Sequence, residues 1–367
     1  MKYIADKAKR PVYLQLYRQI RDDIIGGAYA YGAKLPSRRT LAEEVGVSTV
    51  TVEHAYALLC DEGYAEAHER SGFRVIFRQS DGFVSPGETR AELSQRPQKS
   101  VKPSPYPVFP VSVLSRTMRR VLSDRYDVIL EKPPNAGCPE FRGAIKQYLA
   151  RNRGISVDTE QIIVGSGAEY LYGLIVMLLG KDRTYAIETP SYEKIEKIYA
   201  AAGVRYEKLP LTDDGIDSTA LFSSDADILH VTPYMSFPSG ITASASKRHE
   251  YIRWADSADR FIIESDYGSE FAVTARQTET LFALSEGGNV IYLNTFSKTI
   301  SSSMRVGYMV LPKKLTALFY EKLGFYSCTV PTFEQYVLAE LISGGDFERH
   351  INRVRRAIRK SEQEKDG

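Results

Sequence analysis

The stretch that decides the fold is Val290-Ile291-Tyr292-Leu293-Asn294-Thr295-Phe296-Ser297-Lys298-Thr299. Its first four residues form an apolar run that predicts a buried β-strand. Lys298 follows this strand closely, so we expect it at the carboxyl end of a strand rather than on a solvated helix face. Arg305 comes seven residues later. Ligands of α/β sheets collect at the carboxyl ends of the strands, and Lys298 is therefore a candidate site residue.

Apolar runs of the same kind recur from about Val108 onward, with helical patterns between them. They occupy residues 162–164, 185–187, 228–231, 261–263 and 306–311. Short strands that alternate with helices predict an α/β fold in which a mostly parallel sheet carries helices on both faces. We assign residues 107–367 to this domain.

Polar motifs follow three of these strands. Gly165-Ser166-Gly167-Ala168-Glu169 joins a strand to a helix, so its backbone N–H groups can hold an anion at the helix N-terminus. Glu264-Ser265-Asp266-Tyr267 and Thr189-Pro190-Ser191-Tyr192 end two further strands. Each motif alone is a weak signal, because a lone lysine after a strand is usually a surface cation and a lone Gly-Ser-Gly is usually a turn.

Residues 1–78 form a second predicted domain with three helices and a hairpin. Gly26, Gly46 and Gly63 end the helices, while Ser37 and Ser48 are candidate N-caps of the second and third. The expected inward-facing residues are Leu14, Tyr17, Ile20 and Ile24, then Leu41 and Ala42, then Val52, Ala55, Tyr56 and Leu59. Extended runs at 64–68 and 73–77 flank a turn with glycine and predict a hairpin. Together these elements predict a winged helix-turn-helix.

The polar residues of this domain suit DNA. The third helix begins with short hydroxyl side chains that can approach base edges in a major groove, and cations lie on both flanks, where phosphates would meet them. The candidate DNA-binding residues are Lys34, Ser37, Arg38, Arg39, Ser48, Thr49, Thr51, Arg70, Ser71 and Arg74. The alternative is a solvated basic face on a protein-interaction module.

Composition excludes several other classes of protein. The chain has 367 residues, 43% hydrophobic and 26% charged, as in ordinary globular proteins. With no long apolar stretch, no signal sequence and three scattered cysteines, we expect a reduced, cytoplasmic protein without membrane spans. The five histidines show no metal-ligand spacing, so no metal site is expected. Residues 79–106, rich in proline and polar residues, predict a linker.

Taken together, the motifs of the larger domain resemble the fold-type I aminotransferases that use pyridoxal 5'-phosphate (PLP). With a GntR-type winged helix in front, the chain resembles the MocR subfamily of transcription regulators. Further matches are Leu35-Pro36-Ser37-Arg38-Arg39, residues 133–142 and Phe237-Pro238-Ser239-Gly240. The resemblance implies that Lys298 forms a Schiff base with PLP. It also implies a phosphate site made of Thr295, Arg305 and the amides of Ala168 and Glu169.

The resemblance further implies contacts to the cofactor ring. Tyr192 would stack on the ring, Tyr267 would hydrogen-bond its phenolic oxygen, and the loop at Ser236-Phe237 would lie close by. The family reads Glu-Asp-Asp-Tyr where this chain has Glu264-Ser265-Asp266-Tyr267, so Ser265 takes the place of the carboxylate expected against the ring nitrogen. Asp266 is adjacent, but strand alternation aims it the other way unless the local backbone is shifted.

A second departure is the C-terminus, where the family continues into a small domain that closes the cleft; the resemblance implies that this domain is missing here. Our leading hypothesis is a PLP-dependent transcription regulator that senses PLP or a PLP–amine adduct. Two alternatives remain: an aminotransferase with an appended DNA-binding domain, and a DNA-binding regulator whose PLP domain is degenerate. The expected partners are an operator in double-stranded DNA, an amine or amino-acid effector and a second copy of the chain.

Overall fold

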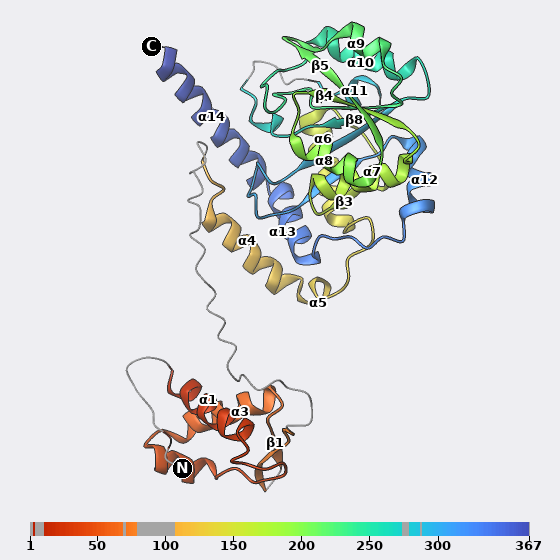
Figure 1. Cartoon of the computed structure of the whole chain (residues 1–367). Coiled ribbons are helices and arrows are strands. Elements are labelled where there is room, and N and C mark those ends of the chain that lie inside the picture. Colours follow the sequence, from red (N-terminus) through yellow and green to blue (C-terminus); the bar gives the residue numbers. More distant parts are fainter. Residues whose placement is uncertain are drawn as a thin grey trace. The chain divides into compact units, whose positions relative to one another are not determined.

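The computed structural model describes Tyr3 and residues 11–68, 71–78, 107–273, 279–286 and 288–366. The chain separates into two compact units, residues 1–101 and 102–367 (Figure 1). Each unit has its own hydrophobic core. The linker predicted at 79–106 and the side chain of Arg70 lie outside the described residues.

The smaller unit contains three helices and a two-stranded hairpin. These are α1 (Val12–Ile25), α2 (Arg38–Val45), α3 (Thr49–Asp61), β1 (Ala65–His68) and β2 (Gly72–Val75). The hydroxyls of Ser37 and Ser48 cap α2 and α3 by accepting from the backbone N–H groups of Thr40 and Thr51. The winged helix-turn-helix predicted from the sequence therefore has the expected elements, closed by the antiparallel β1–β2 pair.

One detail of α1 differs from the sequence prediction. Leu14 is only partly covered, whereas Leu16, Tyr17, Ile20 and Ile24 are buried. The buried stripe follows the four-residue spacing of Leu16, Ile20 and Ile24, which places Leu14 at the margin of the face that packs on the core.

The larger unit is built on one eight-stranded sheet. The strands are β3 (Ile162–Gly165), β4 (Thr184–Thr189), β5 (Arg205–Thr212), β6 (Gly215–Ile216), β7 (Ile228–Val231), β8 (Phe261–Ser265), β9 (Val290–Thr295) and β10 (Gly307–Val310). Their order is β3-β10-β9-β8-β7-β4-β5-β6. The five strands β4, β5, β7, β8 and β9 are parallel, while β10 runs antiparallel to both of its neighbours. The predicted mostly parallel α/β sheet is confirmed.

Strands β5 and β6, which form one edge of the sheet, were not predicted from the sequence. In β5 only Leu209 is buried, and the strand contains a proline, so it lacks the apolar run that marked the other strands. Edge strands tolerate such composition because one side of the ladder needs no partner.

Helices cover both faces of the sheet (Figure 1). They are α4 (Val111–Asp124), α5 (Tyr126–Ile129), α6 (Pro139–Arg153), α7 (Ala168–Leu179), α8 (Glu193–Ala202), α9 (Ser218–Ser223), α10 (Ala245–Asp256), α11 (Leu281–Leu284), α12 (Lys313–Leu323), α13 (Thr332–Ser343) and α14 (Asp346–Asp366), with 3-10 turns at Thr159–Gln161 and Ser269–Phe271. Helices α7, α8 and α12 share one core with the sheet, and α6, α10, α13 and α14 share the other.

Strand alternation divides the buried side chains between these two cores. Ile263, Ile291 and Leu293 belong to the core under α7 and α8, whereas Ile262 and Tyr292 belong to the core under α6 and α13. Neighbouring residues at the ends of these strands therefore face different surroundings. None of the described helices combines the length and the apolar composition that crossing a bilayer requires.

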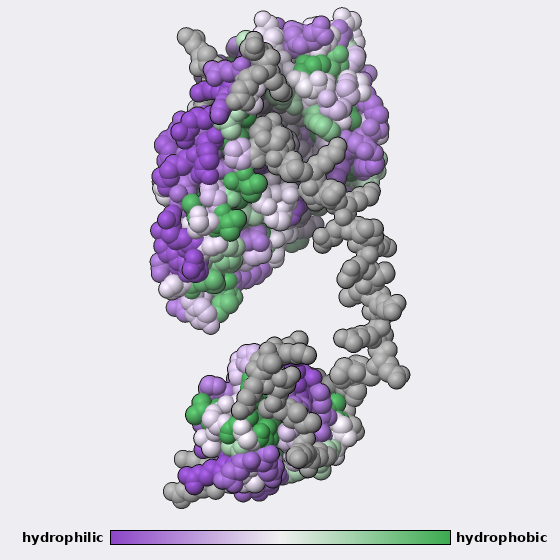
Figure 2. Space-filling model, turned by 90° about the vertical axis from the view of Figure 1, so that its left-hand side faces the viewer, coloured by the Kyte–Doolittle hydropathy of each residue, from purple (hydrophilic) through white to green (hydrophobic). Residues whose placement is uncertain are grey.

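Helix α4 lies at one side of the larger unit, and Figure 2 turns that side toward the viewer. Hydrophobic residues appear there between hydrophilic ones (Figure 2). The exposed large apolar side chains of α4 and α5 are Val111, Leu122, Tyr126 and Val128, and Leu130 follows them.

Candidate functional site

Lys298 lies just beyond the end of β9, in the position that the sequence predicted. Lys298 keeps an exposed surface, and partial desolvation of its ammonium group lowers the pKa of that group. The Nζ atom lies 5.2 Å from the centre of the Tyr267 ring. Gly268 packs against the same side chain with φ at 79°, and a Cβ there would collide with Lys298. This glycine, which the sequence analysis did not select, leaves room for the lysine.

Two of the predicted phosphate-binding residues, Thr295 and Arg305, lie beside the first turn of α7. A Cβ on Gly167 would lie 3.1 Å from the Arg305 guanidinium. A Cβ on Gly307 would lie 3.0 Å from Thr295 Cγ2 and 3.3 Å from Gly167 Cα. The Thr295 hydroxyl is buried and has no hydrogen-bond partner within the described parts of the chain. Thr295, the Arg305 guanidinium and the N-terminus of α7 therefore lie close together, and a helix N-terminus offers free backbone N–H groups to an anion.

Glu169, in the first turn of α7, joins two cations at this place. Its carboxylate accepts from Lys194 Nζ at 2.5 Å and from the Arg305 guanidinium at 3.3 Å. The hydrogen bond from Lys194 holds the pKa of Glu169 below its usual value. Glu169 thus positions Arg305 through its side chain, while its backbone N–H belongs to the helix terminus.

Aromatic side chains stand half-exposed around Lys298. Tyr192 and Tyr267 are 40% and 49% exposed, and burial together with the nearby phenol of Tyr192 raises the pKa of Tyr267. Phe237 packs its ring 6.3 Å from that of Tyr192. The adjacent Ser236 is buried and donates its hydroxyl to Glu188. An open, aromatic wall of this kind suits a flat ring.

Ser265 and Asp266, at the end of β8, face opposite sides of the sheet. The Ser265 hydroxyl lies 2.8 Å from Tyr172 Oη and 2.9 Å from His230 Nε2. Asp266 instead accepts from the Arg153 guanidinium and, at 2.5 Å, from Tyr292 Oη. The structure thus sets Asp266, predicted among the cofactor-binding residues, in a buried ion pair on the other face, as strand alternation requires.

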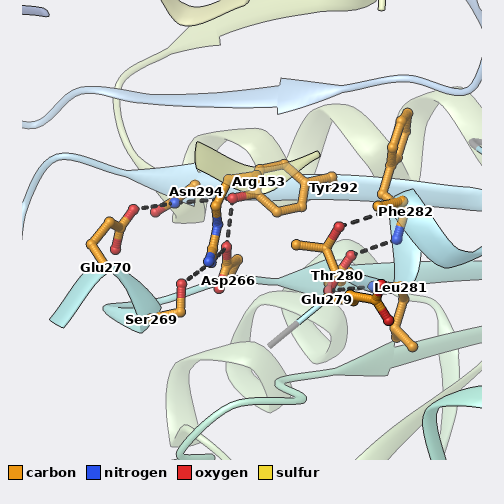
Figure 3. Close-up of polar contacts among 12 residues, drawn as sticks. Arg153, Asp266, Ser269, Glu270, Glu279, Thr280, Leu281, Phe282, Tyr292 and Asn294 are labelled. Carbon is orange, nitrogen blue, oxygen red and sulfur yellow. Dashed lines mark hydrogen bonds and ion pairs between the residues drawn. The ribbon is translucent and has the colours of Figure 1, made fainter. Parts of the chain in front are cut away.

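That ion pair belongs to a buried polar network, in which Arg153 also donates to Ser269 and Asn294 donates to Glu270 at 2.6 Å (Figure 3). Burial raises the pKa of Glu270. The Nε atom of Arg153 and one oxygen of Glu270 have no partner within the described residues, and both residues line a cavity of about 40 Å³. A water molecule needs about 10–15 Å³, so the cavity can hold water that satisfies these atoms.

The predicted DNA-binding residues form an exposed polar surface on the smaller unit. Lys34, Ser37, Arg38, Arg39, Ser48, Thr49 and Arg74 are exposed, and Thr51 and Ser71 are partly exposed. Lys34 and Arg74 face each other in an antiparallel bridge. Arg38 pairs with Glu53 at 2.5 Å. The hydroxyls of Ser37 and Ser48 are engaged as helix caps, so a structural role is already assigned to them.

Comparison with known proteins identifies both units. The model of the bacterial regulatory proteins of the gntR family matches residues 12–75, and that of aminotransferase class I and II matches residues 127–365. The HTH-type transcriptional regulator YdeL of Bacillus subtilis is 32% identical over 95% of this chain and 77% of its own length. The chain belongs to the MocR subfamily of GntR-type regulators.

Two further relatives of this MocR-type chain carry informative names. The probable rhizopine catabolism regulatory protein MocR of Rhizobium meliloti is 28% identical, over 94% of this chain and 74% of the relative. The HTH-type pyridoxine biosynthesis transcriptional regulator PdxR of Corynebacterium glutamicum is 27% identical, over 94% and 76%. Among solved structures, the kynurenine aminotransferase of Pyrococcus horikoshii superposes with a TM-score of 0.62 at 24% identity, covering 69% of this chain and 66% of that one.

Several buried polar side chains that contact Ser265 and Asp266 were not predicted from the sequence. His230, Tyr172 and Tyr199 are buried and linked to Ser265, and Arg153 is buried against Asp266. One signal was present in the sequence: His230 interrupts the apolar run 228–231, and a polar residue inside a buried strand needs a hydrogen-bond partner.

Glu188 predicts a pH dependence of stability in this MocR-type chain. Glu188 is the last residue but one of β4, and burial raises the pKa of its carboxyl from 4.5 to about 7. The folded state therefore binds the proton more tightly than the unfolded state, and this part of the stability is lost as pH rises from 4.5 through about 7. Between about pH 5 and 8, the free energy of unfolding of Glu188→Gln should therefore fall by about 2 kcal/mol less than that of the parent.

Urea unfolding followed by Trp254 fluorescence measures this difference. Trp254 is the only tryptophan in the chain and is fully buried in the larger unit, so its signal reports that unit. The partly exposed, ion-paired Glu196 provides the control, because Glu196→Gln should leave the pH profile between about pH 5 and 8 near that of the parent. Equal pH profiles for the parent and Glu188→Gln would contradict the prediction.

Proposed function

We propose that this chain is a DNA-binding transcription regulator that senses PLP, or an adduct of PLP with an amine or amino acid, through its larger unit. The main support is the buried hydroxyl of Thr295, which has no hydrogen-bond partner among the described residues, near Arg305 and the N-terminus of α7, together with Lys298, whose pKa is lowered by desolvation. These donors fit a phosphate group, and the lysine fits an aldehyde. The relatives MocR and PdxR are named as regulators.

Each residue has a defined task in this proposal. Bound PLP supplies an aldehyde for a primary amine and a ring that withdraws electrons. The Thr295 hydroxyl, the Arg305 guanidinium and the amides of Ala168 and Glu169 hold the phosphate. The lowered pKa of Lys298 increases the fraction of neutral amine, which is the nucleophilic form. Tyr192 stacks on the ring.

Tyr267 completes the set by donating to the phenolic oxygen of the ring. Its phenol stands beside Lys298 and its raised pKa keeps the proton in place at neutral pH. An amine effector can compete with Lys298 for the same aldehyde, and this exchange is the signal we propose. On the smaller unit, the start of α3 enters a major groove while Lys34, Arg38, Arg39, Arg70 and Arg74 meet phosphates.

The experiment that tests this function uses the full chain. PLP is added to the purified protein, its absorbance is recorded before and after borohydride reduction, and the affinity for duplexes selected from a random pool is measured with and without PLP and amine. We expect a reducible adduct and a change in DNA affinity. An adduct that leaves DNA affinity unchanged would contradict sensing, and a protein that forms no adduct would be a regulator with a degenerate PLP domain.

The alternative of a working aminotransferase makes a different prediction. Ser265 offers the ring nitrogen a neutral group in place of a carboxylate, so the ring withdraws electrons less strongly. We expect amines to change the spectrum with little keto acid formed, and Ser265→Asp to increase any amino transfer. Repeated turnover by the parent chain would favour the enzyme.

DNA binding should depend steeply on salt. If about six phosphates are neutralised, log affinity falls against log salt with a slope of about −5, and Arg39→Ala should reduce that slope by about one. Arg21→Ala is a matched control, because Arg21 pairs with its neighbour Asp22 on α1. Equal slopes for the parent and Arg39→Ala would exclude Arg39 as a phosphate contact.

A second copy of the chain is the remaining proposed partner. The exposed apolar residues of α4 and α5, with Leu130, support a homodimer of the larger unit (Figure 2). Contiguous apolar patches on a folded surface commonly mark protein contacts.

A further inference from the structure

Four buried polar groups form a continuous hydrogen-bonded chain at the end of β8. Tyr199 Oη lies 2.7 Å from His230 Nδ1, His230 Nε2 lies 2.9 Å from Ser265 Oγ, and Ser265 Oγ lies 2.8 Å from Tyr172 Oη. All four side chains are at most 5% exposed. This series of hydrogen bonds begins at Tyr199 on α8, crosses β7 and β8, and ends at Tyr172 on α7. We refer to it as the Ser265 relay.

The direction of the protons in this relay follows from the number of acceptors. Burial lowers the pKa of His230 to about 3, so the imidazole is neutral and carries one N–H. Tyr199 is fully buried, and His230 Nδ1 is its only hydrogen-bond partner within the described residues. A buried phenol that cannot donate is costly, so Tyr199 donates to Nδ1 and the imidazole proton resides on Nε2.

The donors to Ser265 Oγ follow from the same hydrogen-bond partners. Nε2–H donates to Ser265 Oγ, and Tyr172 donates to the same oxygen, its only hydrogen-bond partner within the described parts of the chain. An oxygen with two lone pairs is then fully used as an acceptor. The Ser265 hydroxyl can still donate one hydrogen bond, and the group that receives it must be an acceptor.

We propose that Ser265 donates this hydrogen bond to the ring nitrogen of PLP, which is thereby held unprotonated, and that Tyr199, His230 and Tyr172 are positioning residues that aim the proton. The inference rests on the proposed function, since it requires PLP in the site. In this proposal the relay disfavours the protonated form of the ring nitrogen. A carboxylate at position 265 would have the opposite effect, because it accepts a hydrogen bond and so favours a protonated ring nitrogen.

No neighbouring carboxylate replaces Ser265 as the partner of the ring nitrogen. Asp266 is committed to Arg153 and Tyr292 on the opposite face, and the side chains bonded to Ser265 are a neutral imidazole and a phenol. The site therefore keeps an amine, that of Lys298, which can react with the aldehyde of PLP. An unprotonated ring nitrogen makes the ring withdraw electrons less strongly. That combination suits a receptor that binds amines rather than an enzyme that turns them over.

Nitrogen-15 NMR of the full chain loaded with PLP, labelled at the ring nitrogen, tests the proposal at neutral pH. Mass spectrometry of the borohydride-reduced protein first establishes loading. We expect the parent to show the chemical shift of an unprotonated pyridine and Ser265→Asp to move toward the protonated value. A protonated shift in the loaded parent would overturn the proposal while leaving PLP binding intact. Absence of any adduct would instead overturn the proposed function.

Tyr199→Phe tests the positioning role separately. Without the phenol, His230 is free to carry its proton on Nδ1 and to accept from Ser265, so the apparent pKa of the ring nitrogen should rise. Tyr185→Phe is the matched control, because the Tyr185 ring packs 4.9 Å from that of Tyr199 but takes no part in the relay. An unchanged ring-nitrogen pKa in Tyr199→Phe would overturn the roles of Tyr199 and His230. If Ser265→Asp fails to fold, the nitrogen-15 chemical shift of the PLP-loaded parent still tests whether the ring nitrogen is unprotonated.

Discussion

Lys298→Ala is expected to abolish the PLP adduct that borohydride traps in the parent protein. The amine of Lys298 has a pKa lowered by desolvation and lies beside the Tyr267 ring. Thr295 ends the preceding strand β9, and Arg305 lies in the loop that follows it. Removing Nζ removes the nucleophile, so the loss should be complete rather than partial. The measurement is mass spectrometry of peptides from reduced protein.

Two other lysines, Lys208 and Lys194, serve to test whether the adduct forms specifically at Lys298. Lys208→Ala should keep the adduct, because Lys208 is paired with Glu196 at 2.8 Å on the edge strand β5. Lys194 is the alternative target, since its Nζ lies 6.0 Å from the centre of the Tyr192 ring. An adduct that persists on Lys194 in Lys298→Ala would show that Lys298 is not the residue that binds the aldehyde.

Asp266→Ala should destabilise the larger unit by about 3 to 5 kcal/mol, the usual cost of stranding one member of a buried ion pair. The side chains of Arg153 and Asp266 are 5% and 6% exposed. Without the carboxylate, the guanidinium keeps only the hydroxyl of Ser269 as a hydrogen-bond partner within the described residues, and Tyr292 loses the oxygen to which it donates. Urea unfolding followed by Trp254 fluorescence measures the change.

Two further variants separate this explanation from a general loss of packing. Glu193→Ala removes an exposed pair with Lys197 and should leave the unfolding midpoint nearly unchanged. Replacing both buried partners, as Arg153→Met with Asp266→Leu, should recover a large part of the stability, because no charge is then left alone. A small effect of Asp266→Ala, no larger than that of Glu193→Ala, would contradict the prediction.

Much of the fold could be predicted because the central strands are apolar runs. The segments around Ile163, Ile263 and Ile291 are buried on both faces, and composition alone marks such strands. Lys298 could be predicted as a site residue because it follows one of them directly. The order of the strands could not be predicted, since it depends on pairings between distant segments such as β3 and β10.

The supporting residues of the site were harder to find for the same reason. His230 and Ser265 meet only because β7 and β8 are neighbours in a register that pairs His230 with Ile263. Arg153 is the last residue of α6. At such a position the sequence predicts an exposed cation that interacts with the helix dipole. Its burial follows from the position of Asp266, which is remote in sequence. Tertiary pairing, rather than local pattern, decides both cases.

The position of β10 also determines when the larger unit can be completed during synthesis. Among the described strands, β10 alone pairs with β3, and this pairing sets Gly165 opposite Gly307. A ribosome that adds about 5–20 residues per second leaves β3 without its neighbour for on the order of ten seconds. The smaller unit has its core within the first 77 residues and can form long before. In a nascent chain, the winged helix-turn-helix can thus be complete before the loop at Gly165 reaches its final form.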